Sequence, residues 1–153
     1  MEKIIDDPVF LEGIAWKRRQ FDANEIIVNK GELGKSFFFV QAGELRVTIH
    51  VPVEERRNIQ AGVNDLKEGD FFGEISLFES RLRTATVTGI TDGLLLEIDG
   101  KMLGSYLDEH PLQGYVFMKV LFETMINRMT SGIHRIESLM AWGLKAHGIS
   151  KHL

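Results

Sequence analysis

Apolar and polar residues alternate along the middle of the chain in short runs that are separated by turn residues. The clearest run extends from Glu44 to Val51, where every second side chain is apolar, and Pro52 is expected to end it. This alternation is typical of a strand that buries one face. Similar runs, separated by glycine-containing turns, fill residues 21–98. We therefore predict a mainly β domain of about eight strands, folded as an antiparallel jelly-roll barrel of the double-stranded β-helix type.

A short helix is predicted before this barrel, within residues 1–20. Asp7 is a favourable N-cap, and Pro8 is pre-set for the first helical position. Apolar residues from Val9 to Ala15 then supply one face before the basic trio Lys17-Arg18-Arg19. We interpret this helix as a lid on one end of the barrel and assign no chemistry to the basic trio.

The chain becomes helical again over residues 99–145. Residues 101–110 predict a short helix that Pro111 stops. Residues 112–144 predict one long helix, which its glycines weaken without preventing. We assign these helices to a lid and to dimerisation, and residues 146–153 to a tail.

The predicted long helix carries more apolar surface than a single barrel could cover. At about 100° per residue, apolar side chains from Tyr115 to Met140 gather on one stripe. Their spacing of three and four residues is that of a coiled-coil seam. We therefore expect the second half of the helix to pair with the same helix of another subunit in a homodimer.

Composition narrows the class of protein. The chain has 153 residues, of which 44% are apolar, so it is long enough for one folded domain with an extension. Its net charge of −4 and the scattering of its 18 Lys and Arg residues favour no nucleic-acid partner. It contains no cysteine, which excludes disulfides and agrees with a cytoplasmic location. The sequence shows no signal peptide and no apolar run of about 18 residues, so no membrane segment is expected.

The stretch Phe71–Val87 carries the candidate chemistry. Gly73 permits a sharp backbone turn, and residues 74–78 are long enough for one short helical turn whose first amide groups could hold an anion. Arg83 follows nine residues after Glu74, so its guanidinium could meet the same anion from the far end of the loop. These residues predict a phosphate site, and an ordinary surface ion pair between Glu74 and Arg83 is the alternative.

In this stretch, Phe72-Gly73-Glu74-Ile75-Ser76-Leu77 followed by Arg83-Thr84-Ala85-Thr86-Val87 resembles the phosphate-binding cassette of cyclic nucleotide-binding domains. That module occurs in catabolite activator proteins, cyclic-nucleotide-dependent kinases and gated channels, and its fold is a jelly roll. Within the cassette, the resemblance implies that Glu74 holds the ribose 2′-hydroxyl and that Arg83 and Thr84 meet the cyclic phosphate. The implied ligand-binding set also includes Phe72 and, through backbone groups, Gly73, Ile75 and Ser76.

The resemblance leaves the base open between adenine and guanine. A hydroxyl at Thr84 accompanies guanine preference in some relatives, whereas bacterial relatives with a hydroxyl there accept adenine. Thr130-Ser131 in the long helix resembles the Thr-Ser pair with which catabolite activator proteins reach the adenine amino group across the dimer, although its distance from Arg83 differs from theirs. Thr130 is therefore either a ligand contact or a solvated helix residue. We expect cyclic AMP as the ligand, with cyclic GMP as the alternative.

Three functions are compatible with a barrel of this kind. The first is a stand-alone sensor that signals to a separate effector protein through its C-terminal helix, since few residues follow Leu144. The second is a dimeric interaction or structural protein that binds no nucleotide. The third is a metal-dependent enzyme of the cupin type, which the five histidines disfavour because they form no HxH pair beside a carboxylate. We expect no enzyme activity, no metal and no cofactor, because no nucleophile with an adjacent base is found either.

Overall fold

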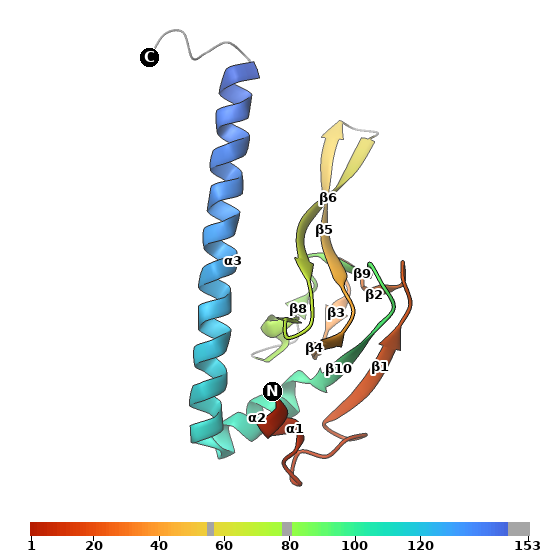
Figure 1. Cartoon of the computed structure of the whole chain (residues 1–153), viewed down its shortest axis with the longest axis vertical. Helices are drawn as coiled ribbons and strands as arrows, with labels where there is room; N and C mark the ends of the chain where they lie inside the picture. Colours follow the sequence, from red (N-terminus) through yellow and green to blue (C-terminus); the bar gives the residue numbers. More distant parts are fainter. Residues whose placement is uncertain (55–56, 78–80, 147–153) are drawn as a thin grey trace. The chain divides into compact units, whose positions relative to one another are not determined.

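A computed structural model describes residues 1–54, 57–77 and 81–146 of the chain (Figure 1). The chain divides into two compact units, Met1–Pro111 and Leu112–Leu153, and each is described by itself. The predicted tail lies outside the described residues from position 147 onward, as do residues 78–80 of the candidate stretch.

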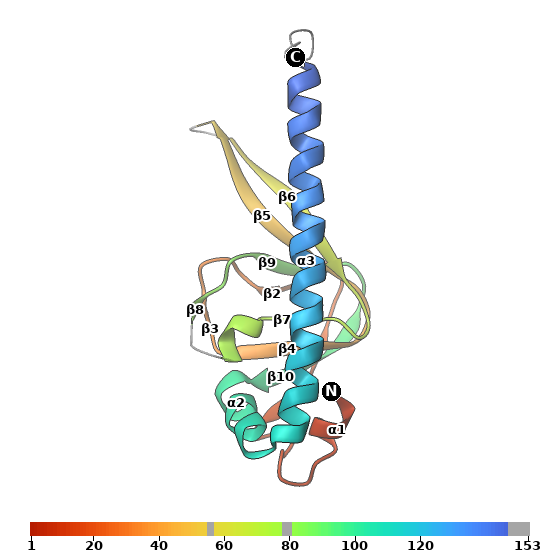
Figure 2. The ribbon, with the colours of Figure 1, turned by 90° about the vertical axis from the view of Figure 1, so that its left-hand side faces the viewer.

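The first unit is built from antiparallel sheets, as predicted (Figures 1 and 2). Two sheets have four strands each, and a third has two, which gives the mainly β, jelly-roll architecture expected from the alternating runs. The strands of the first sheet, in spatial order, are β1 (Trp16–Phe21), β10 (Gly93–Asp99), β4 (Ser36–Ala42) and β7 (Phe71–Phe72). Those of the second sheet are β2 (Ile26–Val28), β9 (Thr86–Gly89), β5 (Leu45–Glu54) and β6 (Arg57–Leu66), and the small sheet pairs β3 (Leu33–Gly34) with β8 (Arg81–Leu82).

The hydrophobic core is filled from both four-stranded sheets. Phe38 and Leu95 of the first sheet and Leu45 and Val87 of the second are all buried in one cluster. Burying a side chain of this size stabilises the folded state by about 1.5–3 kcal/mol relative to leaving it exposed. The sheets are therefore fixed face to face by their apolar positions, and the loops at their edges are positioned by this core.

The alternation along β5 is less regular than the sequence predicts. The pairing of β5 with β6 shifts its register between Val47 and Thr48, and Thr48 is buried although it belongs to the polar half of the run. The prediction that Pro52 ends this strand is wrong, because β5 continues to Glu54. A second register shift lies between Pro52 and Glu54, and irregular pairing is where a strand tolerates the missing N–H of proline.

A short N-terminal helix is present within residues 1–20, as predicted, but it lies earlier and is shorter than expected. The helix α1 spans only Glu2–Ile5. Asp7 does accept a hydrogen bond from the Val9 amide (3.0 Å), but this bond closes a turn and no helix follows. Gly13 then adopts a φ of 83°, a conformation that no right-handed helix contains.

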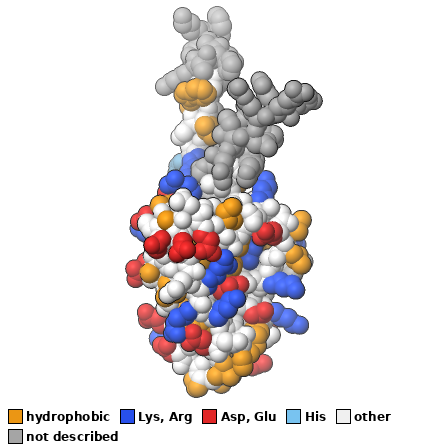
Figure 3. All heavy atoms as spheres, turned by 90° about the vertical axis from the view of Figure 1, so that its right-hand side faces the viewer, with side chains coloured by type: hydrophobic (Ala, Val, Ile, Leu, Met, Phe, Trp, Pro, Cys, Tyr) orange, Lys and Arg blue, Asp and Glu red, His pale blue; other side chains and the backbone are white. Residues whose placement is uncertain are grey.

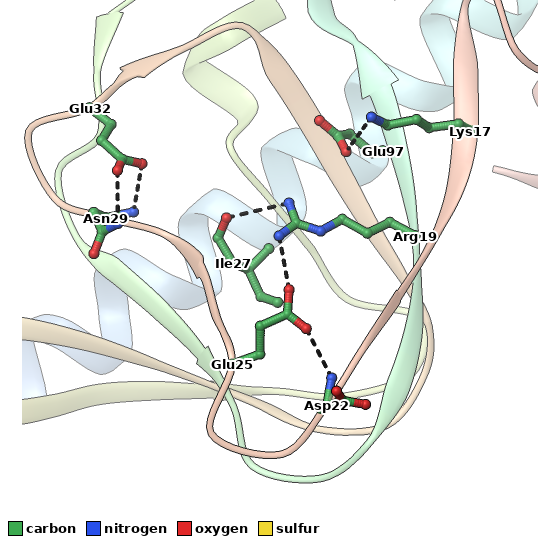
Figure 4. A network of polar contacts seen from close by, with 8 residues as sticks. All are labelled: Lys17, Arg19, Asp22, Glu25, Ile27, Asn29, Glu32 and Glu97. Carbon is green, nitrogen blue, oxygen red and sulfur yellow. Dashed lines mark hydrogen bonds and ion pairs between the residues drawn. The ribbon is translucent and has the colours of Figure 1, made fainter.

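The basic trio belongs to β1 and not to a helix end. Trp16 and Phe21, at the two ends of this strand, are buried, and the strand pairs with β10. The charged side chains between them are paired with carboxylates. Lys17 pairs with Glu97 (3.3 Å) and Arg19 with Glu25 (3.1 Å), as Figure 4 shows, and Arg18 pairs with Glu12 (2.7 Å). Tertiary pairing with β10 therefore prevailed over the local preference for a helix.

The surface that carries β1 shows positive and negative side chains intermixed (Figure 3). Hydrophobic side chains gather at the lower end of this view, and the segment between α1 and β1 exposes Val9, Leu11 and Ile14. On the face shown, no large patch of a single charge is seen.

The helices after the sheets are close to those predicted. The helix α2 spans Gly100–Glu109, and the side chain of Asp99 caps it by accepting a hydrogen bond from the Met102 amide (2.8 Å). The helix α3 spans Pro111–Ala146. In the described part of the chain, no helix combines the length and the apolar character that a bilayer-spanning segment requires.

Candidate functional site

The turn that follows β7 has the predicted geometry. Gly73 adopts a φ of 78°, which glycine tolerates and most residues do not, and a short 3₁₀ helix, η1, follows over Glu74–Leu77. The amide and the hydroxyl of Ser76 both donate to the Gly73 carbonyl, at 3.0 and 2.7 Å. Ser76 thus fixes the turn, and a contact from its backbone amide to a ligand would have to share or replace the first of these bonds.

Arg83 is held against this turn by contacts with neutral groups. Its Nη2 atom donates to the carbonyl of Ser36 (2.7 Å), and its Cζ atom lies 5.5 Å from the centroid of the Phe38 ring. Its main chain is fixed as well, since its amide donates to the Glu32 carbonyl and its carbonyl accepts from the Gly31 amide, each at 2.8 Å. Residues Gly31 and Glu32, just before β3, therefore hold the backbone of Arg83, and β4 holds its side chain.

The electrostatics around Arg83 favour a fixed positive charge. Burial lowers the pKa of the guanidinium from its usual value, and the negative charges of Glu74, Glu97 and Glu32 oppose that shift. Because an arginine begins from so high a pKa, it stays protonated at physiological pH. Glu32 is itself kept ionised by Asn29, whose amide and side chain both donate to its carboxylate (3.1 and 2.8 Å) and lower its pKa (Figure 4).

Further polar contacts hold Ser36, whose carbonyl accepts the hydrogen bond from Arg83. The hydroxyl of Ser36 donates to Glu97 (3.1 Å). The other carboxylate oxygen of Glu97 pairs with Lys17 (3.3 Å), and Figure 4 shows this pair. Ser36 therefore connects Arg83, which its carbonyl binds, to a charged pair formed between β1 and β10. These supporting residues were not found from the sequence, where the only signal was that Gly34-Lys35-Ser36 directly precedes a predicted strand.

The remaining predicted site residues occupy different environments. Phe72 is buried, and its ring stacks on Phe38 with 4.7 Å between centroids, so its side chain supports the site from the core. Ile75 and Thr84 are exposed, Thr84 in the bend directly after Arg83. Thr130 is exposed on α3, in the second unit, so its contact with a ligand stays a prediction.

Together, these residues form a place where a small anion can be bound. Gly73, Glu74 and Ser76 form the turn, and Arg83 contributes a half-buried cation beside it. A guanidinium binds a phosphate through strong, charge-assisted hydrogen bonds, and a backbone turn can add amide donors. The carboxylate of Glu74 can accept hydrogen bonds from hydroxyl groups. The combination suits a ligand with one phosphate and one hydroxyl close together.

Comparison with known proteins gives a family match that contains this whole region. Residues 18–110 match the family model described as the cyclic nucleotide-binding domain. The chain is 34% identical to a cGMP-dependent protein kinase, egl-4, of Caenorhabditis elegans over 90 residues, which is 55% of this chain and 11% of the kinase. It is 35% identical to a cAMP-dependent protein kinase regulatory subunit of Yarrowia lipolytica over 86 residues, which is 54% of this chain and 21% of that subunit.

The fold is also found among solved structures. A cyclic nucleotide-binding domain from Methylobacillus flagellatus superposes with a TM-score of 0.71, at 16% identity, over 81% of this chain and 67% of that one. At this identity the likeness concerns the fold alone. The matches to the two kinase proteins span only 11% and 21% of their lengths.

Proposed function

The chain belongs to the cyclic nucleotide-binding domain family, and on this premise we propose that it is a non-catalytic sensor that binds a cyclic nucleotide and signals to a separate effector protein. Cyclic AMP is the proposed ligand, with cyclic GMP as the alternative. Both nucleotides appear in the names of relatives, one a cGMP-dependent kinase and the other a cAMP-dependent kinase subunit. We place this sensor in the cytoplasm.

The observation that carries the proposal is the position of Arg83. Its guanidinium is half-buried next to Gly73, donates to a backbone carbonyl and lies near an aromatic ring. A cyclic phosphate keeps one negative charge at every physiological pH, and it loses water when it is bound in a pocket. It therefore needs a fixed cation and hydrogen-bond donors, and Arg83 with the turn at Gly73 supplies both.

Glu74 and Thr84 are assigned the neighbouring groups of the ligand. Glu74 lies in η1 at the end of the turn, and its negative charge acts on Arg83. We assign its carboxylate to the ribose 2′-hydroxyl, which lies close to the cyclic phosphate in a 3′,5′-cyclic nucleotide. The exposed hydroxyl of Thr84 is assigned to the phosphate. Thr130 remains the candidate for a base contact.

Dimerisation through α3 is the proposed route by which binding is signalled. From Phe122 onward, exposed apolar residues recur at intervals of four, three, four, three and four residues: Phe122, Ile126, Met129, Ile133, Ile136 and Met140. This is a heptad pattern, in which each side chain packs into the facing helix of a partner. With Phe122 at 68% and Met140 at 65% exposure in a single chain, a second copy would remove this stripe from water.

Thermal unfolding with and without nucleotide tests the proposed function. At a hundredfold excess over its dissociation constant, a ligand that binds only the folded state adds about 2.7 kcal/mol of stability. For a domain of this size, that corresponds to a rise in melting temperature of roughly 5–10 °C. An unchanged melting temperature with millimolar cyclic AMP or cyclic GMP would favour the alternative hypothesis, a dimeric interaction protein that binds no nucleotide. Elemental analysis for a bound transition metal tests the cupin-type enzyme.

A further inference from the structure

The side chain of Arg83 lies across two glycines. A Cβ atom built on Gly34 would lie 2.5 Å from Cζ and 2.9 Å from Cδ of Arg83. A Cβ atom on Gly73 would lie 2.5 Å from Nη1 of Arg83 and 2.8 Å from the carbonyl oxygen of Ser36. Contacts below about 3 Å between such atoms are strongly repulsive, so the space that the guanidinium occupies exists only because both positions lack a side chain.

The two glycines are required for different reasons. Gly73 has a φ of 78°, so its backbone conformation alone favours glycine. Gly34 lies in β3, and it is not one of the described residues that have a positive φ. At Gly34 the three nearest atoms that a Cβ would meet all belong to the side chain of Arg83. The closest conflict of an alanine there is thus with one flexible side chain.

We propose that Gly34 is a positioning residue for Arg83. Because Gly34 has no side chain, the side chain of Arg83 can occupy the space beside it, and from there its guanidinium is directed at the phosphate. The backbone of Arg83 cannot yield to an added methyl group at low cost. It is tied to Glu32 and Gly31 by two hydrogen bonds of 2.8 Å, and Gly34 pairs with Arg81 in the small sheet. The conflict is therefore relieved by rotation of the Arg83 side chain, which moves its charge and leaves the fold in place.

This inference rests on the proposed function for its effect on affinity, and calorimetry on five versions of the whole chain tests it. The proteins are wild type, Gly34→Ala, Arg83→Ala and the double variant, with Gly132→Ala as a control because a Cβ there meets nothing within 4 Å. We expect Gly34→Ala to weaken cyclic nucleotide binding at least about tenfold, since it displaces one partner of a desolvated charge pair. In the Arg83→Ala background, the same substitution should change affinity less than about twofold, because the group on which it acts is gone.

A second readout needs no ligand. The Nε–H signal of Arg83 in an ¹⁵N–¹H NMR spectrum, assigned from its loss in Arg83→Ala, reports where the guanidinium lies relative to the Phe38 ring. We expect it to shift in Gly34→Ala and to stay in place in Gly132→Ala. If Gly34→Ala fails to fold, restoration of folding by the added Arg83→Ala change supports the steric conflict, and failure to restore it overturns the inference.

The other outcomes separate this inference from the proposed function. Wild-type affinity in Gly34→Ala overturns the inference, and so does an equal loss of affinity in the presence and absence of Arg83. If the wild-type protein binds neither cyclic AMP nor cyclic GMP, the proposed function fails. The NMR signal then decides the role of Gly34 alone, and an unchanged Nε–H signal in Gly34→Ala rejects it.

Discussion

Replacing Arg83 with alanine should weaken cyclic nucleotide binding by roughly thirty- to several-thousand-fold. The guanidinium is half-buried against Phe38 and the Ser36 carbonyl, so a phosphate that it meets would be partly removed from water. Removing one partner of a desolvated charge pair typically costs about 2–5 kcal/mol, and each 1.4 kcal/mol is about a tenfold change in affinity. The effect should therefore far exceed the error of a calorimetric titration.

Arg81 provides the matched control for this experiment. It lies two residues earlier, in β8, and its side chain is exposed. Arg81→Ala removes the same charge from the same stretch of the chain, so we expect a loss of less than about tenfold, the modest effect of an exposed charge. Both variants are titrated with cyclic AMP and cyclic GMP after their melting temperatures show that they are folded. If Arg83→Ala kept wild-type affinity while Arg81→Ala lost it, the assignment of the cassette would be wrong by two residues.

Three further predictions concern Glu74, the apolar stripe of α3 and the hydroxyl of Tyr106. Glu74→Ala should reduce the preference for cyclic AMP over its 2′-deoxy form, which paired titrations measure; an unchanged preference would reject the ribose contact. Met129→Glu with Ile136→Glu should give folded monomers by light scattering, because unpaired charges in a dry seam cost several kcal/mol, and a wild type that is already monomeric at micromolar concentration would reject the dimer. Burial of Tyr106, together with its 2.7 Å hydrogen bond to Asp7, raises the pKa of its hydroxyl to about 12. Between pH 10 and 12, Tyr106 therefore keeps its proton in the folded state, whereas the unfolded chain loses it. Its contribution to stability is therefore complete below pH 10 and lost as the pH rises to about 12, a decline that denaturant titrations should show for wild type and not for Tyr106→Phe.

Much of the fold could be predicted because its signals are local. Alternating runs marked the strands, and Asp99 and Pro111 marked the boundaries of α2. The N-terminal segment was mistaken because Asp7 and Pro8 are good helix-start residues wherever they occur. What places Trp16 in a strand is its pairing with Ile98, more than eighty positions away in the sequence. No local pattern contains that information.

The features of the candidate site also fall into two groups, those that a local sequence pattern predicts and those that only the fold reveals. The turn at Gly73 and the cation at Arg83 lie within one short stretch, so their spacing could be read directly. The groups that hold the side chain of Arg83 come from the strand that starts at Ser36, 47 positions before the arginine in the sequence. Contacts of this kind depend on how the sheets pack, and the space left by Gly34 is visible only once the side chain beside it has been located.

Isothermal titration of the wild-type protein with cyclic AMP, cyclic GMP and the non-cyclic 5′-AMP tests the central claim most directly. The account predicts saturable binding of at least one cyclic nucleotide to a single site per chain, and much weaker binding of 5′-AMP, which carries a second negative charge and lacks the cyclic phosphate that the turn and Arg83 are proposed to hold. The absence of heat of binding with both cyclic nucleotides at millimolar concentration, from a folded protein, would contradict it.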